Sequence, residues 1–424
     1  MLFGKKSKEK NPSEEMKFTA RLGRYFSTEP QKERVLRRED FHAVGDVYYA
    51  DVSASYKVLQ RGIWLVFILF MVCSLVFNYS AITYDNFFYL IKDFSSAADS
   101  GGTNYETLSY EADSRQKFQL YRGGVAAVSP SKISVFTATG RRTLNAASAY
   151  SSPYIISSDR YILIYDTAGK NFSLYNSFAR IHTESLEYPV YDACFGEDGS
   201  FAIATRTADS LSSIHLYDKN FKFAGKVSED IYVFDLAMNR SQNALSVLSY
   251  EMGDGVGRTV LTTRNTKTLQ AEEKIHFDGE FPLGCVYIDS NLLAVMTDRY
   301  VRILDKNFEE IAISADYSGE EILAYNLTEE GVVLATSYAS QTNLIAFDKK
   351  GKMVYNDFVR LNPSDVALYG SYLFLQTERG VTRIRHKNGD QEQLDCGRGT
   401  LLIYNESTAV VCGESKAEYL VFRD

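Results

Sequence analysis

The chain has 424 residues, enough for several average domains or for one large β-propeller or barrel. Tyr (30 residues) and Phe (26 residues) are abundant and Pro is scarce (7 residues), which favours an all-β fold over a disordered chain. The net charge is −8, but residues 1–62 hold 13 Lys/Arg against 9 Asp/Glu, which leaves −12 for residues 63–424. This acidic bulk argues against nucleic-acid binding, which needs clustered Lys and Arg.

The N-terminal residues 1–62 are predicted to form a basic, largely disordered tail, and residues 63–83 a transmembrane helix. From Ile63 to Phe77 every residue except Ser74 is apolar, and the stretch continues to Ile82. About 20 residues at 1.5 Å each cover the ~30 Å hydrocarbon core of a bilayer. A cleaved signal peptide would begin near residue 1, so we expect a retained single-pass anchor that contacts membrane lipid through Ile63–Ile82.

The charges beside this span predict its orientation. Lys57 and Arg61 precede it, whereas Asp85 follows it. The positive-inside rule therefore places the N-terminus in the cytoplasm, where the tail could bind a partner. Residues 84–104 are then a juxtamembrane linker, and residues 105–424 an extracellular domain at the cell membrane.

A repeat runs through the extracellular part. Short apolar strands flank a polar turn, often written Asp-Lys-Asn or Asp-Lys-Lys, at intervals of 38 to 46 residues. A period near 40 is typical of four-stranded propeller blades. The first residues of these turns are Thr137, Asn176, Asp218, Arg264, Asp305, Asp348, His386 and Asp424.

Glycine and asparagine occur at turns within the units, and proline occurs where a unit begins. Turns inside the units that need positive φ are predicted at Gly199, Asn243, Gly331 and Gly370. Prolines stand where a unit's first strand begins, and a missing N–H there breaks no ladder bond; these are Pro153, Pro189, Pro282 and Pro363.

Eight turns predict eight blades, or seven if one unit is misassigned. The last unit has strands near Leu401, Val410 and Tyr419 but ends before a fourth. The segment Tyr105–Asp113 precedes the first full blade and could supply that strand. Such a closure would remove the exposed sheet edges.

Four segments carry a resemblance to a known family: the membrane anchor, YDNFFYLIKD (residues 84–93), FTATGRR (136–142) and YPVYDACFGEDGSFAI (188–203). With them the chain resembles a clostridial (Firmicutes) family of membrane-anchored, propeller-like proteins classed as a domain of unknown function. The resemblance implies a Gram-positive cell membrane as the location. It implies no activity and no site residue.

The sequence contains no recognisable catalytic, nucleotide-binding or metal-binding motif. The five cysteines form no CxxC pair and the five histidines stand far apart, so we expect free, buried cysteines and no metal site. No nucleotide, hydrolase or metalloprotease motif occurs, and no catalytic residue is assigned. Quinone-dependent propellers use recurrent tryptophans, whereas this chain has only Trp64, so no cofactor is expected.

The candidate binding site is therefore the set of loops at one mouth of the channel. There the turns between second and third strands of the blades meet the connections between blades, and exposed side chains on a rigid scaffold commonly bind ligands. The candidates are Arg206, Asp209, Glu251, Asp254, Arg258, Asp298, Arg299, Tyr338, Glu378 and Arg379.

Two functions follow from this prediction. The first is a non-enzymatic binding or scaffold module for an extracellular protein, a peptide or a cell-envelope ligand. The alternative is a hydrolase or lyase of cell-wall polymer that uses carboxylates at the channel mouth. Paired acids ~5 Å or ~6.5–9.5 Å apart would favour a glycosidase, whereas dispersed charges would favour binding.

Overall fold

The computed structural model describes residues 41–77, 84, 88, 105–239, 241, 243–253 and 255–423. The chain divides into two compact units, Met1–Asp93 and Phe94–Asp424. In the first unit, α2 (Phe41–Phe77) is one continuous helix with no Pro to interrupt it. It begins within residues 1–62, which the sequence predicts to be largely disordered; residues 1–40 lie outside the described part.

The predicted transmembrane helix gains no support from the structure. Within the described residues, no helix combines the length and the apolarity that crossing a membrane requires. The predicted span, Ile63–Ile82, continues beyond Phe77 into residues that are not described.

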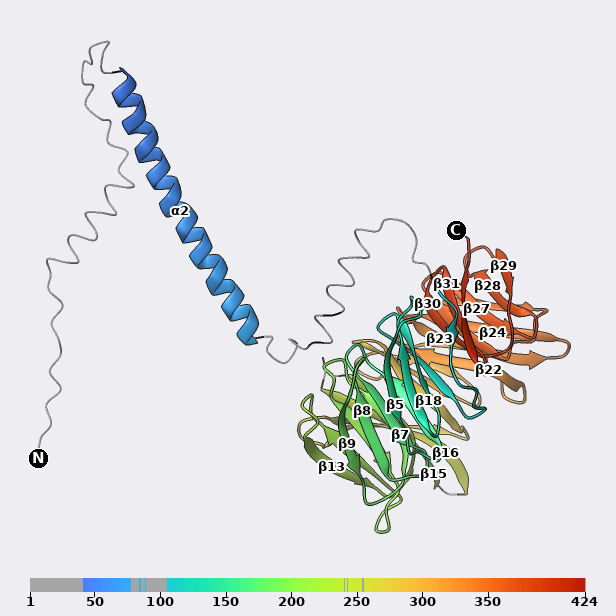
Figure 1. Ribbon diagram of the computed structural model, residues 1–424. Helices are drawn as coiled ribbons and strands as arrows, with labels where there is room; N and C mark the ends of the chain where they lie inside the picture. The colour runs from blue at the N-terminus through green and yellow to red at the C-terminus, as the bar shows by residue number, and fades with distance from the viewer. Residues whose placement is uncertain are drawn as a thin grey trace, which may run out of the picture. The chain divides into compact units, whose positions relative to one another are not determined.

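The second unit is all β and consists of eight antiparallel four-stranded sheets (Figure 1). Each sheet is one propeller blade, and we number the blades in chain order. Blade 1 is β2 (Lys117–Tyr121), β3 (Gly124–Val128), β4 (Lys132–Phe136) and β5 (Arg142–Ala147); blade 2 is β6 (Pro153–Ser157), β7 (Ile162–Asp166), β8 (Asn171–Tyr175) and β9 (Arg180–Ser185); blade 3 is β10 (Val190–Phe195), β11 (Phe201–Thr205), β12 (Ser212–Tyr217) and β13 (Phe223–Glu229); blade 4 is β14 (Tyr232–Asn239), β15 (Ala244–Gly253), β16 (Val256–Asn265) and β17 (Ala271–Asp278).

The second half of the unit repeats this order. Blade 5 is β18 (Pro282–Asp289), β19 (Leu292–Thr297), β20 (Val301–Leu304) and β21 (Glu310–Ile313); blade 6 is β22 (Glu321–Thr328), β23 (Gly331–Tyr338), β24 (Gln341–Asp348) and β25 (Met353–Val359); blade 7 is β26 (Asp365–Tyr369), β27 (Tyr372–Thr377), β28 (Gly380–Arg385) and β29 (Gln391–Asp395); blade 8 is β30 (Thr400–Asn405), β31 (Thr408–Cys412), β32 (Lys416–Val421) and β1 (Leu108–Ser109).

The first strand of every blade is the inner strand. Each inner strand contacts the inner strands of both neighbouring blades, and β30 contacts β2, so the ring is closed. In blade 8 the fourth strand is β1, where Leu108 pairs with Ala417 and Ser109 with Lys416. The structure thus confirms eight blades and the predicted closure by Tyr105–Asp113.

The repeated Asp-Lys turn connects the third and fourth strands of a blade. The Asp218 carboxylate accepts hydrogen bonds from the backbone N–H groups of Asn220 (2.8 Å) and Lys222 (2.9 Å). Asp305 and Asp348 bind the equivalent N–H groups of their own turns. These local hydrogen bonds explain why the repeat can be recognised in the sequence. The aspartate side chain stabilises its own turn without help from other parts of the chain.

The glycines and the asparagine of the turns, and the prolines that precede the inner strands, also lie where the sequence predicts. The four turn residues Gly199, Asn243, Gly331 and Gly370 all have positive φ, from 53° to 140°. At Gly331, a Cβ atom would lie 2.2 Å from the Phe347 carbonyl oxygen, so only glycine fits this turn. The four prolines stand at, or one or two residues before, the first residue of an inner strand.

Hydrophobic clusters between neighbouring blades form the core. One cluster joins Val128 and Ile133 of blade 1 to Ile162 and Ile164 of blade 2, all fully buried, and similar clusters follow around the ring. All five cysteines are free, but only Cys285 and Cys412 are buried as predicted; Cys194 and Cys396 are half-buried, and Cys73 is exposed on α2.

Candidate functional site

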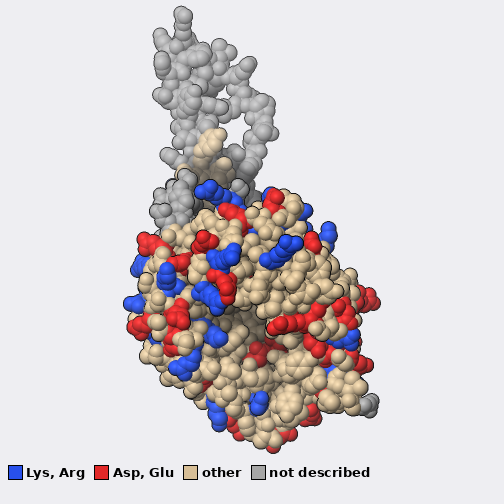
Figure 2. All heavy atoms as spheres, turned by 90° about the vertical axis from the view of Figure 1, so that its right-hand side faces the viewer, with Lys and Arg blue, Asp and Glu red and all other residues tan. Residues whose placement is uncertain are grey.

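One end of the ring carries the turns between second and third strands together with the connections between blades. We call this end the hairpin rim, because antiparallel order brings both kinds of connection to the same edge of every blade. Figure 2 shows one face of the molecule, hollowed in its middle, with Asp and Glu side chains in and beside the hollow. A rigid ring that presents loops around a central hollow is a setting in which binding sites are common.

The predicted site residues lie on this rim but do not converge. They come from five blades, and Asp254 lies outside the described residues. Arg206 and Asp209 are in the β11–β12 loop, Glu251 and Arg258 in the β15–β16 hairpin, Asp298 and Arg299 in the β19–β20 turn, Tyr338 at the end of β23, and Glu378 and Arg379 in the β27–β28 turn.

Most of the predicted charges already have partners nearby. Arg258 binds Glu251 at 2.5 Å, and Arg299 binds Asp316 at 2.6 Å. Glu378 pairs with Arg398. Exposed pairs of this kind contribute little free energy and leave no free charge for a ligand. The structure therefore shows dispersed charges and no carboxylate pair among those predicted residues that it describes.

An aromatic cluster lies on the hairpin rim of blade 4, and its residues are not among the candidates predicted from the sequence. The rings of Phe234, Tyr250 and Phe281 contact one another, with centroids 5.0, 5.1 and 6.2 Å apart. Phe234 is 41% and Phe281 39% exposed, and Tyr232 beside them is 51% exposed. We call these four residues the aromatic ledge. Its sequence signal is the spacing of Tyr232 and Phe234, two positions apart on one strand and therefore on one face.

The ledge is extended by the longest hairpin of the propeller. Strands β15 and β16 are ten residues each, and Met252 and Val256 near the hairpin tip are 68% and 52% exposed. With the ledge they make an apolar surface beside the Glu251–Arg258 pair. Large exposed apolar side chains that gather on one surface commonly mark an interaction site.

Buried polar contacts hold the ledge in place. Glu280, next to Phe281, accepts hydrogen bonds from both terminal nitrogens of Arg302 at 2.6 and 2.7 Å and from the Thr297 hydroxyl at 2.6 Å. The Asp298 carboxylate accepts the Phe281 N–H at 2.8 Å. The loop that presents Phe281 is therefore rigid, which reduces the entropy lost when a partner binds.

A second unpredicted feature is a carboxyl pair on the inner strands. Asp192 of β10 and Asp235 of β14 occupy equivalent positions, each immediately after a β-bulge. Their carboxyl groups lie close enough for each to change the pKa of the other. The Asp235 carboxylate also accepts the Cys285 N–H of the next blade at 2.6 Å. The sequence signal was a lone Asp within an apolar strand.

Burial dominates the electrostatics of this pair. It raises the pKa of Asp192 well above the usual range, with the Asp235 charge as the next cause, and it raises the pKa of Asp235 to about 6. The ionisable groups that face the pair are Tyr154, Tyr165, Tyr325, Cys194 and Cys285. Among the described residues, no group of three or more His, Cys, Asp or Glu side chains is placed to hold a metal ion.

The same contact recurs in blade 7, where the Asp365 carboxylate accepts the Leu401 N–H of blade 8 at 3.1 Å. An inner strand has no neighbouring strand on its channel side, so some of its N–H groups need another acceptor. An aspartate from the preceding blade supplies it. This contact explains the inner-strand aspartates as links between blades.

The fold and the rim define the class of the protein: it is a closed eight-bladed β-propeller. The chain belongs to the family of unknown function DUF5711, whose family model matches residues 101–416. This match supports the resemblance to a propeller-like family of unknown function; it shows neither the clostridial source nor the membrane anchor. No curated protein matches the sequence.

Two solved structures with TM-scores above 0.5 support the fold. The chain is similar to Sqt1 from Saccharomyces cerevisiae, with a TM-score of 0.54 and 10% identity over 76% of this chain and 100% of that one. It is also similar to the computationally designed protein Ika8, with a TM-score of 0.51 and 10% identity over 75% and 100%. BamB from Moraxella catarrhalis aligns with a TM-score of 0.49 and 11% identity over 75% and 99%. At these identities the likeness concerns the fold alone.

Proposed function

We propose that the propeller is a non-enzymatic binding or scaffold module that docks a protein or peptide on the hairpin rim. The observation that carries this proposal is the aromatic ledge. Interface hot spots are enriched in rigid aromatic side chains surrounded by polar groups, and the ledge has this composition. It lies beside the charged residues Glu251, Arg258 and Asp298 that the sequence marks as binding candidates.

The alternative, a hydrolase or lyase of cell-wall polymer, has less support. The described candidate carboxylates, Asp209, Glu251, Asp298 and Glu378, lie on four different blades, and Glu251 and Glu378 pair with arginine. Asp192 and Asp235 do lie together, but the Asp235 carboxylate already accepts the inner-strand N–H of Cys285. A glycosidase instead needs two carboxyls on either side of the scissile bond.

The location at a membrane is a second part of the proposal. It rests on the apolar run from Ile63 to Ile82 and on the exposure of its side chains. The large apolar side chains of α2 from Ile63 to Val72, together with Val76 and Phe77, are 46% to 84% exposed. A helix that is apolar on all sides needs an apolar surrounding, which lipid would provide. The flanking charges then favour an extracellular propeller and a cytoplasmic N-terminus.

Crosslinking of the full-length chain in its native membrane tests the docking proposal. The double variant Phe234→Ser, Phe281→Ser should reduce recovery of the crosslinked partner at least tenfold, because loss of an aromatic hot spot commonly costs ~2 kcal/mol or more. The matched control is Phe223→Ser, Ile311→Ser, two apolar side chains that are 57% and 52% exposed at the starts of β13 and β21, at the opposite end of the blades from the hairpin rim.

The control pair should leave recovery unchanged. Equal recovery from both double variants would contradict docking on the ledge. Failure to recover a partner either with the full-length chain or with a chain that lacks residues 1–62 would count against the scaffold function as a whole.

A further inference from the structure

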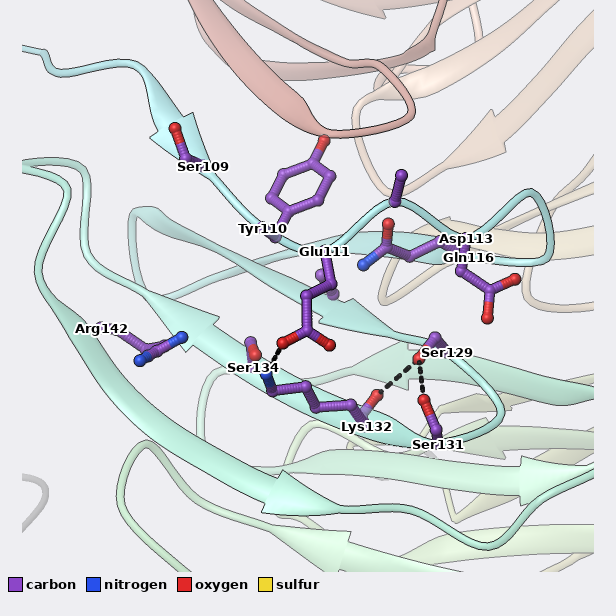
Figure 3. A pocket seen from close by; sticks show the side chains of 12 residues that line it. Ser109, Tyr110, Glu111, Asp113, Gln116, Ser129, Ser131, Lys132, Ser134 and Arg142 are labelled. Carbon is purple, nitrogen blue, oxygen red and sulfur yellow. Dashed lines mark hydrogen bonds and ion pairs between the residues drawn. The ribbon is translucent and has the colours of Figure 1, made fainter.

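A polar groove lies where β1 closes the ring against blade 1. It has a volume of about 300 Å³ and combines Ser109 and the segment Tyr110–Gln116 with residues of β3, β4 and β5. Figure 3 shows the Glu111 carboxylate directed toward Lys132, and the two groups form an ion pair at 2.8 Å. Lys132 and Arg142 are matched in number by Glu111 and Asp113, so the formal charges of the lining sum to zero, although the ion-pair partner of Asp113 is Arg115, at 3.8 Å. Its only large ring is Tyr110.

Several polar groups of this groove have no partner in the described residues. The Gln116 amide oxygen is buried without a hydrogen bond. Ser134 is only 5% exposed, and no hydrogen bond to its hydroxyl group is found. The Arg142 guanidinium is exposed and makes no hydrogen bond or ion pair. A buried polar group without a partner costs free energy, which a ligand hydroxyl could recover.

The neighbouring groove between blades 1 and 2 shows that this arrangement is specific. Ser173 occupies the same position in β8 as Ser134 in β4, yet its hydroxyl accepts a hydrogen bond from Tyr150 at 2.7 Å and bonds Thr183 at 2.7 Å. At the closing groove the corresponding tyrosine, Tyr110, donates instead to the Gly413 carbonyl at 2.8 Å. Ser134 is thereby left available.

We propose that the closing groove binds a neutral, hydroxyl-rich ligand the size of one sugar ring. A volume of about 300 Å³ lies at the small end of the ~300–1,000 Å³ that is typical of small-molecule pockets. A lining without net charge gives no advantage to a charged ligand, whereas serine hydroxyls, an amide and a guanidinium suit a ring of hydroxyls. This site is separate from the aromatic ledge, so neither proposal depends on the other.

Ligand binding would also hold the closing segment, Ser109 to Gln116, against blade 1. One wall of the groove, Ser109 to Gln116, belongs to the closing segment, and the other belongs to blade 1. A ligand that bridges the walls stabilises the closed state by mass action. We therefore expect slower amide hydrogen exchange in residues 108–116 and in β32, with which β1 pairs.

The test titrates the full-length chain in detergent with N-acetylglucosamine and glucose by calorimetry, followed by hydrogen exchange. We expect saturable binding with a Kd on the order of 1 mM. Glucuronate and glucosamine, which carry opposite charges on the same ring, should bind more weakly. Arg142→Ala should weaken binding about tenfold, because it removes a charged hydrogen-bond donor.

The matched control is Arg180→Ala, which removes the equivalent arginine from the blade 1–2 groove. Both arginines are exposed on their strands, so both variants should fold, and a thermal melt checks this. The proposal is overturned if neither neutral sugar binds, if Arg142→Ala binds like the wild type, or if slower exchange appears at residues 148–150 and 173–183 instead. Equal binding of all four sugars would also overturn it.

Discussion

Asp192 and Asp235 show how single residues join the blades of this ring. The Asp235 carboxylate binds a backbone N–H group of blade 5, while the Asp192 carboxyl lies beside Asp235 and the two groups change each other's pKa. Glycine at position 284 makes room for this contact, because a Cβ atom there would lie 3.1 Å from the Asp235 Oδ2 atom. These contacts between blades therefore depend on the protonation state of Asp192 and Asp235.

This dependence predicts how stability changes with pH. Burial raises the pKa of both carboxyls, that of Asp235 to about 6. A raised pKa stabilises the fold fully below the unfolded value of ~3.9, and this stabilisation is lost as the pH rises through the folded value. In Asp192→Asn, the introduced amide can donate to Asp235 at every pH. The variant should match the wild type near pH 4 and exceed its free energy of unfolding by about 1–2 kcal/mol near pH 8.

Urea unfolding followed by circular dichroism at both pH values measures this difference. Asp209→Asn, on an exposed loop of the same blade, controls for the loss of one negative charge and should behave like the wild type at both. A wild type that is at least as stable as Asp192→Asn near pH 8 would contradict a protonated carboxyl pair.

Among the elements, β1 has an effect out of proportion to its length. It has two residues, yet it is the fourth strand of blade 8 and covers the edge of β32. Its Leu108 side chain is 1% exposed and packs against Val125 and Phe136 of blade 1 and Val410 of blade 8. This single side chain therefore packs at the interface between the first and last blades.

Shortening this side chain should open the ring. Leu108→Ala removes buried methyl groups, which typically costs ~2–5 kcal/mol. Detachment of β1 would uncover the edge of β32, and free edges promote association between chains. We expect a lower urea midpoint and concentration-dependent oligomers in sedimentation velocity. Ser109→Ala, at the exposed neighbour, should change neither measurement, and an unchanged monomer with Leu108→Ala would contradict this role of β1.

At the scale of the whole molecule, the sequence predicts the ring better than it predicts the site. The number of blades can be predicted from the sequence because the Asp-Lys turns, such as the one at Asp218, are held by hydrogen bonds within a segment of five residues. The contact of Asp192 with Asp235, or of Phe234 with Phe281, depends on which blades are neighbours and how their inner strands face each other. Those distances are set by the packed ring, so the sequence shows a lone Asp or Phe but not its partner.

The last prediction concerns the topology of the whole chain. If Ile63–Ile82 spans the cell membrane with the N-terminus inside, a protease added to intact cells without their wall should digest a tag after Asp424 and spare a tag before Met1. The physical reason is that Lys57 and Arg61 are retained on the cytoplasmic side, where positive charge is favoured. Detergent-lysed cells are the control, in which a tag before Met1 should also be digested. Survival of both tags in intact cells, or digestion of only the N-terminal one, would contradict this topology.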